Sequence, residues 1–414
     1  MPRSKHRGAA APLSRSRIGL ALAGGGPLGA VYEIGALCAL EESIEGLDLT
    51  ALDGYVGVSA GGFIAAGLVN GMSARELCAS FIENKGAAHD IFEPSVLVQP
   101  AWAEFARRMA TLPTLIAQAA FGYAFQRRSL ATAFERLARA LPAGLFSNER
   151  IELQLRRQFD RPGRTNDFRQ LEHKLVLVAT DLDSGSSAPF GQPGFDHVPI
   201  SKAVQASSAL PGLFPPVEID GHHYVDGALK KTLHASVLLD EGLDLLICLN
   251  PLVPFDASPT NRHRVMARSQ ERIPKLVDGG LPVVLSQTFR TLIHSRLELG
   301  MKGYDTSHPH TDIMLFEPDH RDPEMFLANT FSYSQRRRLA EHAFQQTRRM
   351  LRERAADLVP RLARHGLALR EAVLADDTRR LLPDPAGKAP ENAGARAMRK
   401  LEAVLDDLER SITD

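Results

Sequence analysis

The sequence predicts an α/β protein, a three-layer α/β/α sandwich around a mainly parallel sheet. Short apolar runs at 18–23 and 54–58 read as strands, and amphipathic patterns at 28–42 and 63–70 read as the helices that follow them. This βαβα order is typical of a parallel sheet covered by helices. Further apolar runs predict strands at 174–179, 221–225, 245–250 and 312–316.

Composition limits the function classes. Lys+Arg and Asp+Glu number 49 each, so the chain as a whole does not have the positive charge of a nucleic-acid-binding protein. The three cysteines, Cys38, Cys78 and Cys248, show no CxxC spacing, which argues against a disulfide framework or a zinc site. They fit a reducing compartment, so a cytoplasmic location is expected.

The chain divides into four expected regions. A basic flexible tail at 1–17 is expected to precede an α/β core at 18–255, which carries a helical insertion at about 87–160. A helical C-terminal extension is expected at 256–375. The remainder, 376–414, reads as a linker and a terminal amphipathic helix.

The stretch 109–126 carries no charge and is bracketed by arginine pairs. It is short for a transmembrane helix, and a proline, a glutamine and a glycine interrupt it. Two interpretations stay open. The stretch is either a buried helix on the sheet or an interfacial segment whose Leu115, Ile116, Phe121 and Phe125 meet lipid chains.

The glycine turn after the first strand has two readings. Gly24-x-Gly26-x-x-Gly29 satisfies the dinucleotide-binding fingerprint between a strand and a helix. That motif also needs an acidic residue at the end of the next strand, to bind the ribose. Asp48 is at a suitable distance, but it precedes the strand at 54–58. The turn is therefore interpreted as one that binds a reacting oxygen.

A candidate nucleophile stands at the end of the second strand. Gly57-Val58-Ser59-Ala60-Gly61 is a G-x-S-x-G turn, in which glycines let the backbone bend and leave the serine hydroxyl projecting. Adjacent parallel strands would bring both glycine turns to one edge of the sheet. Backbone N–H groups of Gly24–Gly29 could then stabilise an oxyanion that forms at Ser59.

A serine nucleophile needs a base. Tyr224-Val225-Asp226-Gly227-Ala228 reads as a strand that ends in a carboxylate, placed to take the serine proton directly. No later histidine has a convincing loop signature. Surface or helical positions are expected for His234, His294, His308, His310 and His342.

Together, GGGPLG, GVSAG and DGA resemble the motifs of the patatin-like phospholipase family, acyl hydrolases that use a Ser–Asp dyad. The segments 206–216 and 179–185 are also similar to that family's sequence blocks. The resemblance implies Ser59 as nucleophile and Asp226 as base. It further implies an oxyanion hole made by Gly24, Gly25 and Gly26, supported by Gly29, Gly57, Gly61 and Gly227.

Leu28 departs from the family pattern, which commonly has Arg or Lys just before the last glycine of that loop. The departure puts a strong preference for anionic headgroups in doubt. The expected function is hydrolysis of lipid carboxylic esters, of the phospholipase A or lysophospholipase type, through an acyl-enzyme. The alternative is a binding or scaffold protein on a lipid or granule surface with low turnover.

The expected partner is a lipid ester substrate, with peripheral membrane contact and no nucleic acid. No cofactor and no metal is expected, and the sequence indicates no oligomeric state.

Overall fold

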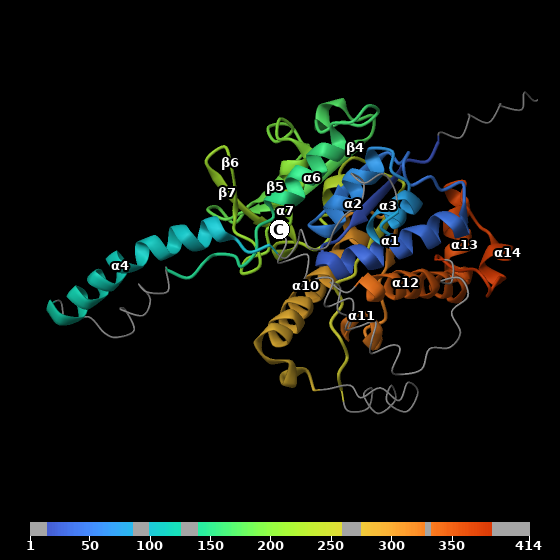
Figure 1. The fold of residues 1–414 in the computed structure, drawn as a ribbon. Coiled ribbons are helices and arrows are strands. Elements are labelled where there is room, and N and C mark those ends of the chain that lie inside the picture. Colours follow the sequence, from blue (N-terminus) through green and yellow to red (C-terminus); the bar gives the residue numbers. More distant parts are fainter. Residues whose placement is uncertain (1–14, 86–98, 126–139, 259–274, 328–332, 383–414) are drawn as a thin grey trace, which may run out of the picture.

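The computed structural model describes residues 15–85, 99–125, 140–258, 275–327 and 333–382 (Figure 1). Its main sheet has eight strands in the order β6-β7-β4-β3-β1-β8-β9, with β5 paired to β4. A separate two-stranded sheet joins β2 to β10. The strands are β1 (Ile18–Leu22), β2 (Ile44–Glu45), β3 (Gly54–Gly57), β4 (Lys174–Asp181), β5 (Ser187–Phe190), β6 (Val217–Ile219), β7 (His222–Asp226), β8 (Leu245–Leu249), β9 (Asp312–Phe316) and β10 (Ala368–Leu369).

The centre of the main sheet is parallel. β4, β3, β1, β8 and β9 pair in parallel, so their carboxyl ends meet at one edge of the sheet. The pairing of β1 with β3 confirms the expected neighbourhood of the two glycine turns. β5 and β7 pair antiparallel with β4, and β6 pairs antiparallel with β7. Neither β5 nor β6 was predicted from the sequence.

Helices cover both faces of the sheet (Figure 1). α1 starts at a proline-containing turn and α3 has a capping box between Ser73 and Glu76, both common at helix starts. The α-helices are α1 (Gly26–Ser43), α2 (Ala60–Val69), α3 (Ala74–Phe81), α4 (Trp102–Phe125), α6 (Glu149–Phe159), α7 (Ile200–Ser207), α8 (Ser236–Leu239), α10 (Gly280–Ser307), α11 (Pro323–Leu327), α12 (Tyr333–Glu353), α13 (Ala355–Arg364) and α14 (Glu371–Ala375).

Alternation along the strands creates two hydrophobic cores. In β1, Leu20 and Leu22 belong to the core shared with α1, α2 and α12, whereas Ala21 belongs to the core shared with α8 and α10. Successive side chains of a strand point to opposite faces, so one strand supplies both cores. This arrangement confirms the predicted three-layer sandwich.

Residues beyond 255 complete the main sheet and cover α1. β9 pairs with β8, and α12 packs along α1. The approach is close at Gly35, where a Cβ atom would lie 2.4 Å from the carbonyl oxygen of Ala340. Only glycine allows two helices to come this near at that point.

The charge-free stretch forms most of α4, which projects away from the body (Figure 1). Met109, Ile116 and Phe121 are 58%, 52% and 56% exposed, so the stretch is not a buried helix on the sheet. None of the helices described here is long and apolar enough to cross a membrane. The side chain of Phe125 lies outside the described residues, as do the tail up to residue 14 and the segment 383–414.

Candidate active site

Ser59 occupies a strained turn between β3 and α2. Its φ and ψ angles are 53° and −122°, a left-handed conformation that is uncommon for a residue with a Cβ atom. The flanking glycines are sterically required. A Cβ on Gly57 would lie 2.5 Å from the Cα of Gly62, and one on Gly61 would lie 2.5 Å from the carbonyl oxygen of Ala23. The turn therefore has the geometry that the G-x-S-x-G pattern predicts.

Ser207, the last residue of α7, ties this turn to β4. The Ser59 N–H donates to the Ser207 Oγ at 2.8 Å, and that hydroxyl donates to the carbonyl oxygen of Val178 at 2.6 Å. Ser207 is fully buried. Ser207 lies in the block at 206–216, but its role was not predicted from the sequence.

Asp226 lies at the end of β7, beside Ser59. Its Oδ1 accepts from the Ala228 N–H at 2.9 Å. The Ser59 side chain is near enough to lower the pKa of the Asp226 carboxyl. β7 can approach this closely because Gly227 has no side chain. A Cβ there would lie 2.1 Å from the carbonyl oxygen of Val178. The structure thus brings the two predicted dyad residues together.

Burial controls the charge of Asp226. The side chain is 4% exposed, and loss of hydration raises the pKa of its carboxyl to about 6. The hydrogen bonds from Ala228 and Ser59 lower the pKa and offset part of this rise. At neutral pH the group is therefore mainly a buried carboxylate, able to accept a proton.

This buried charge has a cost in stability. The pKa of Asp226 in the folded protein lies above the ordinary value of 3.8. Protonated Asp226 therefore contributes its full stabilisation of the folded protein below pH 3.8, and this contribution is lost as the pH rises through about 6. We expect Asp226→Asn to raise the free energy of unfolding at pH 8 by roughly 1–3 kcal/mol, since each pKa unit is worth 1.36 kcal/mol. Denaturant titrations at pH 5 and pH 8 measure the gain, which should be smaller at pH 5. Glu218→Gln, at an exposed position, controls for loss of one charge, and an equal gain in both variants would contradict the expectation.

The first glycine turn lies against the dyad. A Cβ on Gly24 would be 3.1 Å from the Ser59 Cβ and 3.2 Å from the Ala228 Cβ. The strand ladder reaches Ala23, whose N–H donates to Leu249, and then stops. Within the described chain, the N–H groups of the next three residues donate to no protein acceptor. They are therefore available to an oxyanion.

Gly25 and Gly26 differ in what they tolerate. Gly25 has an extended φ of 176°, but a Cβ there would lie 2.7 Å from the Gly29 Cα and from the Pro251 Cγ. Gly26 has open space around it and a φ of +59°. Gly25 is thus required for packing and Gly26 for backbone conformation. Leu28 is partly buried against the hydrophobic core, so the loop carries no cation at that position.

His234 is a correction to the sequence analysis, which expected a surface or helical position. The ring is 3% exposed, and its Nε2 lies 3.3 Å from the carbonyl oxygen of Gly227. Burial lowers the pKa of His234 to about 4, so the ring is neutral at neutral pH. The turn packs under α10, where the Thr232 hydroxyl donates to Ile293. His234 therefore supports the loop that carries Asp226.

Asp322, Glu324 and His342 are close enough together to suggest a metal site. The two ring nitrogens of His342 each lie against one of the carboxylates, with 2.7 Å from Nδ1 to Glu324. Burial lowers the pKa of His342, but hydrogen bonds to both carboxylates more than compensate and raise it to about 9. The protonated ring therefore forms ion pairs with both carboxylates, and these ion pairs join the start of α11 to α12.

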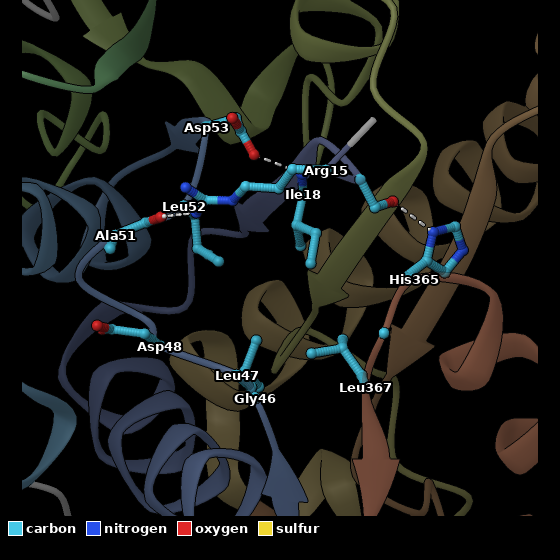
Figure 2. Close-up of a pocket in the computed structure, with 12 residues that line it drawn as sticks. Arg15, Ile18, Gly46, Leu47, Asp48, Ala51, Leu52, Asp53, His365 and Leu367 are labelled. Carbon is cyan, nitrogen blue, oxygen red and sulfur yellow. Dashed lines mark hydrogen bonds between the residues drawn. The ribbon is translucent and has the colours of Figure 1, made fainter. Parts of the chain in front are cut away.

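A cavity of about 120 Å³ lies at the amino ends of β1 and β3 (Figure 2). His365 stands beside it, with Nδ1 2.7 Å from the Ser16 Oγ and Nε2 2.8 Å from the Asp312 Oδ2. Asp312 also pairs with Arg361 and Arg364. The cavity is at the edge of the sheet opposite Ser59. The Ser–His–Asp contact therefore joins the N-terminal segment to the C-terminal helices and is separate from the candidate site.

A mostly parallel sheet with a serine on a strained strand-to-helix turn is typical of α/β hydrolytic enzymes. The patatin-like phospholipase family model matches residues 20–239, just over half of the chain. The chain belongs to the patatin-like phospholipase family, and the expected resemblance is confirmed.

Other similarities cover a smaller part of the chain or have a lower sequence identity. Uncharacterized NTE family proteins of Mycobacterium bovis and Mycobacterium tuberculosis are 33% identical over 81 residues, which is 20% of this chain and 21% of theirs. The chain thus spans about a fifth of these curated relatives. VipD of Legionella pneumophila aligns over 82% of this chain and 67% of its own, with 14% identity and a TM-score of 0.37. The type III effector ExoU aligns over 83% and 54%, with 15% identity and a TM-score of 0.35.

Proposed function

We propose that this protein hydrolyses carboxylic esters of lipids, with Ser59 as nucleophile and Asp226 as its base. The observation that carries the proposal is the proximity of a serine on a strained turn to a buried carboxylate. Membership of a lipid hydrolase family supports the substrate class. The free N–H groups of Gly24, Gly25 and Gly26 support an oxyanion hole at the same edge.

In the first half-reaction, the Asp226 carboxylate takes the hydroxyl proton as the Ser59 Oγ attacks the ester carbonyl carbon. The carbonyl oxygen becomes an oxyanion, which the glycine N–H groups and the amino end of α2 stabilise. The C–O bond to the alcohol then breaks, and Asp226 returns its proton to the departing oxygen. Ser59 is left esterified by the fatty acyl group.

In the second half-reaction, Asp226 removes a proton from a water that attacks the acyl carbon. The same oxyanion hole stabilises the second tetrahedral intermediate. Its collapse breaks the bond between the acyl carbon and the Ser59 Oγ and releases the fatty acid, while Asp226 returns its proton to the Oγ and so restores the hydroxyl. Two carboxylate-assisted steps thus replace one difficult hydrolysis.

Two measurements on the same protein test the proposal. A fluorophosphonate probe should label wild-type protein at Ser59 and leave Ser59→Ala unlabelled. Incubation with a mixed phospholipid extract should release fatty acids that mass spectrometry identifies, with Ser59→Ala as the control. Lipid binding without any release of fatty acid would instead support the binding or scaffold alternative.

The pH profile provides a further prediction. Because the dyad needs ionised Asp226, kcat/KM for a soluble short-chain ester should rise with pH and level off above an apparent pKa of about 6. The rate should fall about tenfold for each pH unit below that value. A stopped assay across pH 4.5 to 8.5 measures the profile. A rate that stays nearly constant down to pH 4.5, as expected for the ordinary carboxyl value of 3.8, would contradict a buried base.

A further inference from the structure

We propose that an uncharged apolar strip beside the dyad binds the acyl chain of the ester substrate. The apolar strip is defined as residues 101–102, 141–145 and 209–213. This inference deepens the proposed function and rests on it, because the acyl chain of a lipid ester must extend away from the dyad in one direction. The apolar strip supplies that direction and a preference for longer chains.

The apolar strip begins at the dyad. The N–H of Asp226 donates to the carbonyl oxygen of Ala209 at 3.0 Å. Two residues before Ala209 stands Ser207, whose hydroxyl accepts from the Ser59 N–H. The first part of the apolar strip is therefore bonded to the backbone of one dyad residue and directly follows the serine that holds the other.

Backbone hydrogen bonds join the three parts of the apolar strip. The N–H of Leu145 donates to the carbonyl oxygen of Gly212 at 3.3 Å, and the N–H of Gly212 donates to that of Ala143 at 3.0 Å. The N–H of Ala101 in turn donates to the carbonyl oxygen of Leu145 at 3.1 Å. The three parts thus lie side by side, in an order that leads away from the dyad.

Two further contacts anchor the apolar strip before any ligand binds. A Cβ on Gly144 would lie 2.2 Å from the carbonyl carbon of Phe214, so these two segments touch along the backbone. The Asn148 Nδ2 donates to the carbonyl oxygen of Gln205 at 3.1 Å, and the Gln205 Nε2 donates to the Asn148 Oδ1 at 3.0 Å. Both side chains are buried, and Gln205 belongs to α7. The backbone of the apolar strip is therefore fixed relative to the Ser59 turn.

Large apolar side chains of the apolar strip face solvent. Trp102, Leu141 and Leu145 are 73%, 67% and 51% exposed. Leu210 and Leu213, which lie closer to the dyad, are half-buried. Exposed apolar side chains gathered at one place mark an interaction site. Their position beside a reaction centre makes a substrate the expected occupant.

The absence of charge indicates which part of the substrate binds there. The segments 99–103, 140–147 and 208–217 contain no Asp, Glu, Lys, Arg or His. A lipid headgroup or a polar protein surface would find no ionic partner on these segments. An alkyl chain needs none, and its contact with apolar side chains is favourable because both surfaces leave water. The acyl chain is therefore the part of a lipid ester that matches this surface.

The layout predicts a dependence on chain length. Hydrogen-bonded backbone segments lie about 4.8 Å apart, so the two steps from Asp226 to Leu145 span roughly 10 Å. A carbon chain advances by about 1.3 Å per atom, which gives about 5 Å for a butyryl group and about 12 Å for a decanoyl group. A butyryl group therefore ends before Leu145, whereas a decanoyl group reaches it.

Fluorescence tests binding without hydrolysis, because Trp102 is the only tryptophan in the chain. In a Ser59→Ala background, methyl decanoate should shift the Trp102 emission to shorter wavelength as the indole leaves water, and methyl butyrate should not. Leu145→Ser should raise the concentration of methyl decanoate needed for half of the shift about tenfold. Leu153→Ser is the matched control, since this side chain is 43% exposed on α6. It should titrate as the parent does.

Kinetics with p-nitrophenyl esters test the apolar strip in versions that keep Ser59. The esters are used below the concentrations at which they aggregate, so that no lipid surface is present. Trp102→Ser and Leu145→Ser should each lower kcat/KM for the decanoate about tenfold and leave kcat/KM for the butyrate unchanged. Leu153→Ser should keep both values.

Three results would overturn the proposal. The first is a Trp102 emission that methyl decanoate does not change. The second is an equal loss of decanoate and butyrate hydrolysis in Trp102→Ser and Leu145→Ser, which would mean that these residues only support the dyad. The third is a dimer in light scattering that the same substitutions dissociate, which would make the apolar strip an interface between two copies of the chain.

The two experiments also separate this inference from the proposed function. If both esters were hydrolysed with Ser59 at rates that the two substitutions did not change, the apolar strip would lose its role and the proposed function would stand. If methyl decanoate shifted the Trp102 emission and Leu145→Ser weakened the effect, while wild-type protein hydrolysed neither ester, the proposed function would fall. The apolar strip would then stand as a binding site for acyl chains.

Discussion

Asp226→Asn should lower turnover of a soluble ester by about a thousandfold, within the range for loss of a general base, and Ser59→Ala should remove it almost completely. Both effects follow from a dyad in which Asp226 alone takes the serine proton. Asparagine keeps the shape of the side chain and the bond from Ala228 but cannot accept that proton. Initial rates with the purified variants, at a pH above 7, measure the loss.

The combined variant provides a check on the mechanism. Residues that act as a unit are non-additive, so Ser59→Ala/Asp226→Asn should be no slower than Ser59→Ala alone. A tenfold loss of rate corresponds to about 1.4 kcal/mol of activation free energy. If Asp226→Asn retained more than about a tenth of the activity, Asp226 would not be the sole base. A histidine-based mechanism would then return, and His234 against Gly227 would be the first residue to replace.

Gly26→Val should lower kcat by about a hundredfold or more while KM changes little, because loss of one oxyanion donor costs that much. A Cβ at this position meets no atom within 4 Å, so packing is preserved. The φ of +59° is strained for valine, and the backbone N–H should rotate away from the oxyanion. Steady-state kinetics with a soluble ester separate the two parameters.

A matched control distinguishes loss of the donor from general strain. Gly163 has a φ of +83° and the same open surroundings, so Gly163→Val imposes a similar conformational cost far from the dyad in sequence. It should destabilise the protein and keep kcat. Gly25→Val is a harsher change, because its side chain would collide with Gly29 and Pro251. An unchanged kcat in correctly folded Gly26→Val and Gly25→Val would exclude this loop as the oxyanion hole.

Features carried by adjacent residues were predictable from the sequence. The two glycine turns each follow a buried strand. Glycine occupies the positions where a Cβ atom would come too close to its neighbours, at Gly57, Gly61 and Gly24. The parallel pairing of β1 and β3 followed from the short βαβ connection. Asp226 was a candidate base because it ends a predicted strand, and the family resemblance supported its location beside Ser59, although β4 separates their strands in the sheet.

Features decided by long-range packing were not predictable. His234 has no local pattern that distinguishes a buried turn from a surface one, and the cover that α10 provides is about 60 residues away in sequence. β6 has only three residues, too few for a period of two to appear. The charge-free stretch of α4 suits burial and exposure equally well as a sequence, and only the arrangement of the whole chain decides between them.

The packing of α12 on α1 shows that the segment matched by the family model is smaller than the unit that has a complete hydrophobic core. The recognisable family segment stops at residue 239, yet the strand next to β8 and the helix against Gly35 come from beyond residue 310. A fragment cut at the end of the recognisable segment would keep every residue proposed for catalysis. It would also leave one edge of the parallel sheet and one side of α1 bare, and such surfaces aggregate. Recombination or transplantation of this protein must therefore follow the limits of its hydrophobic core, which sequence similarity does not mark.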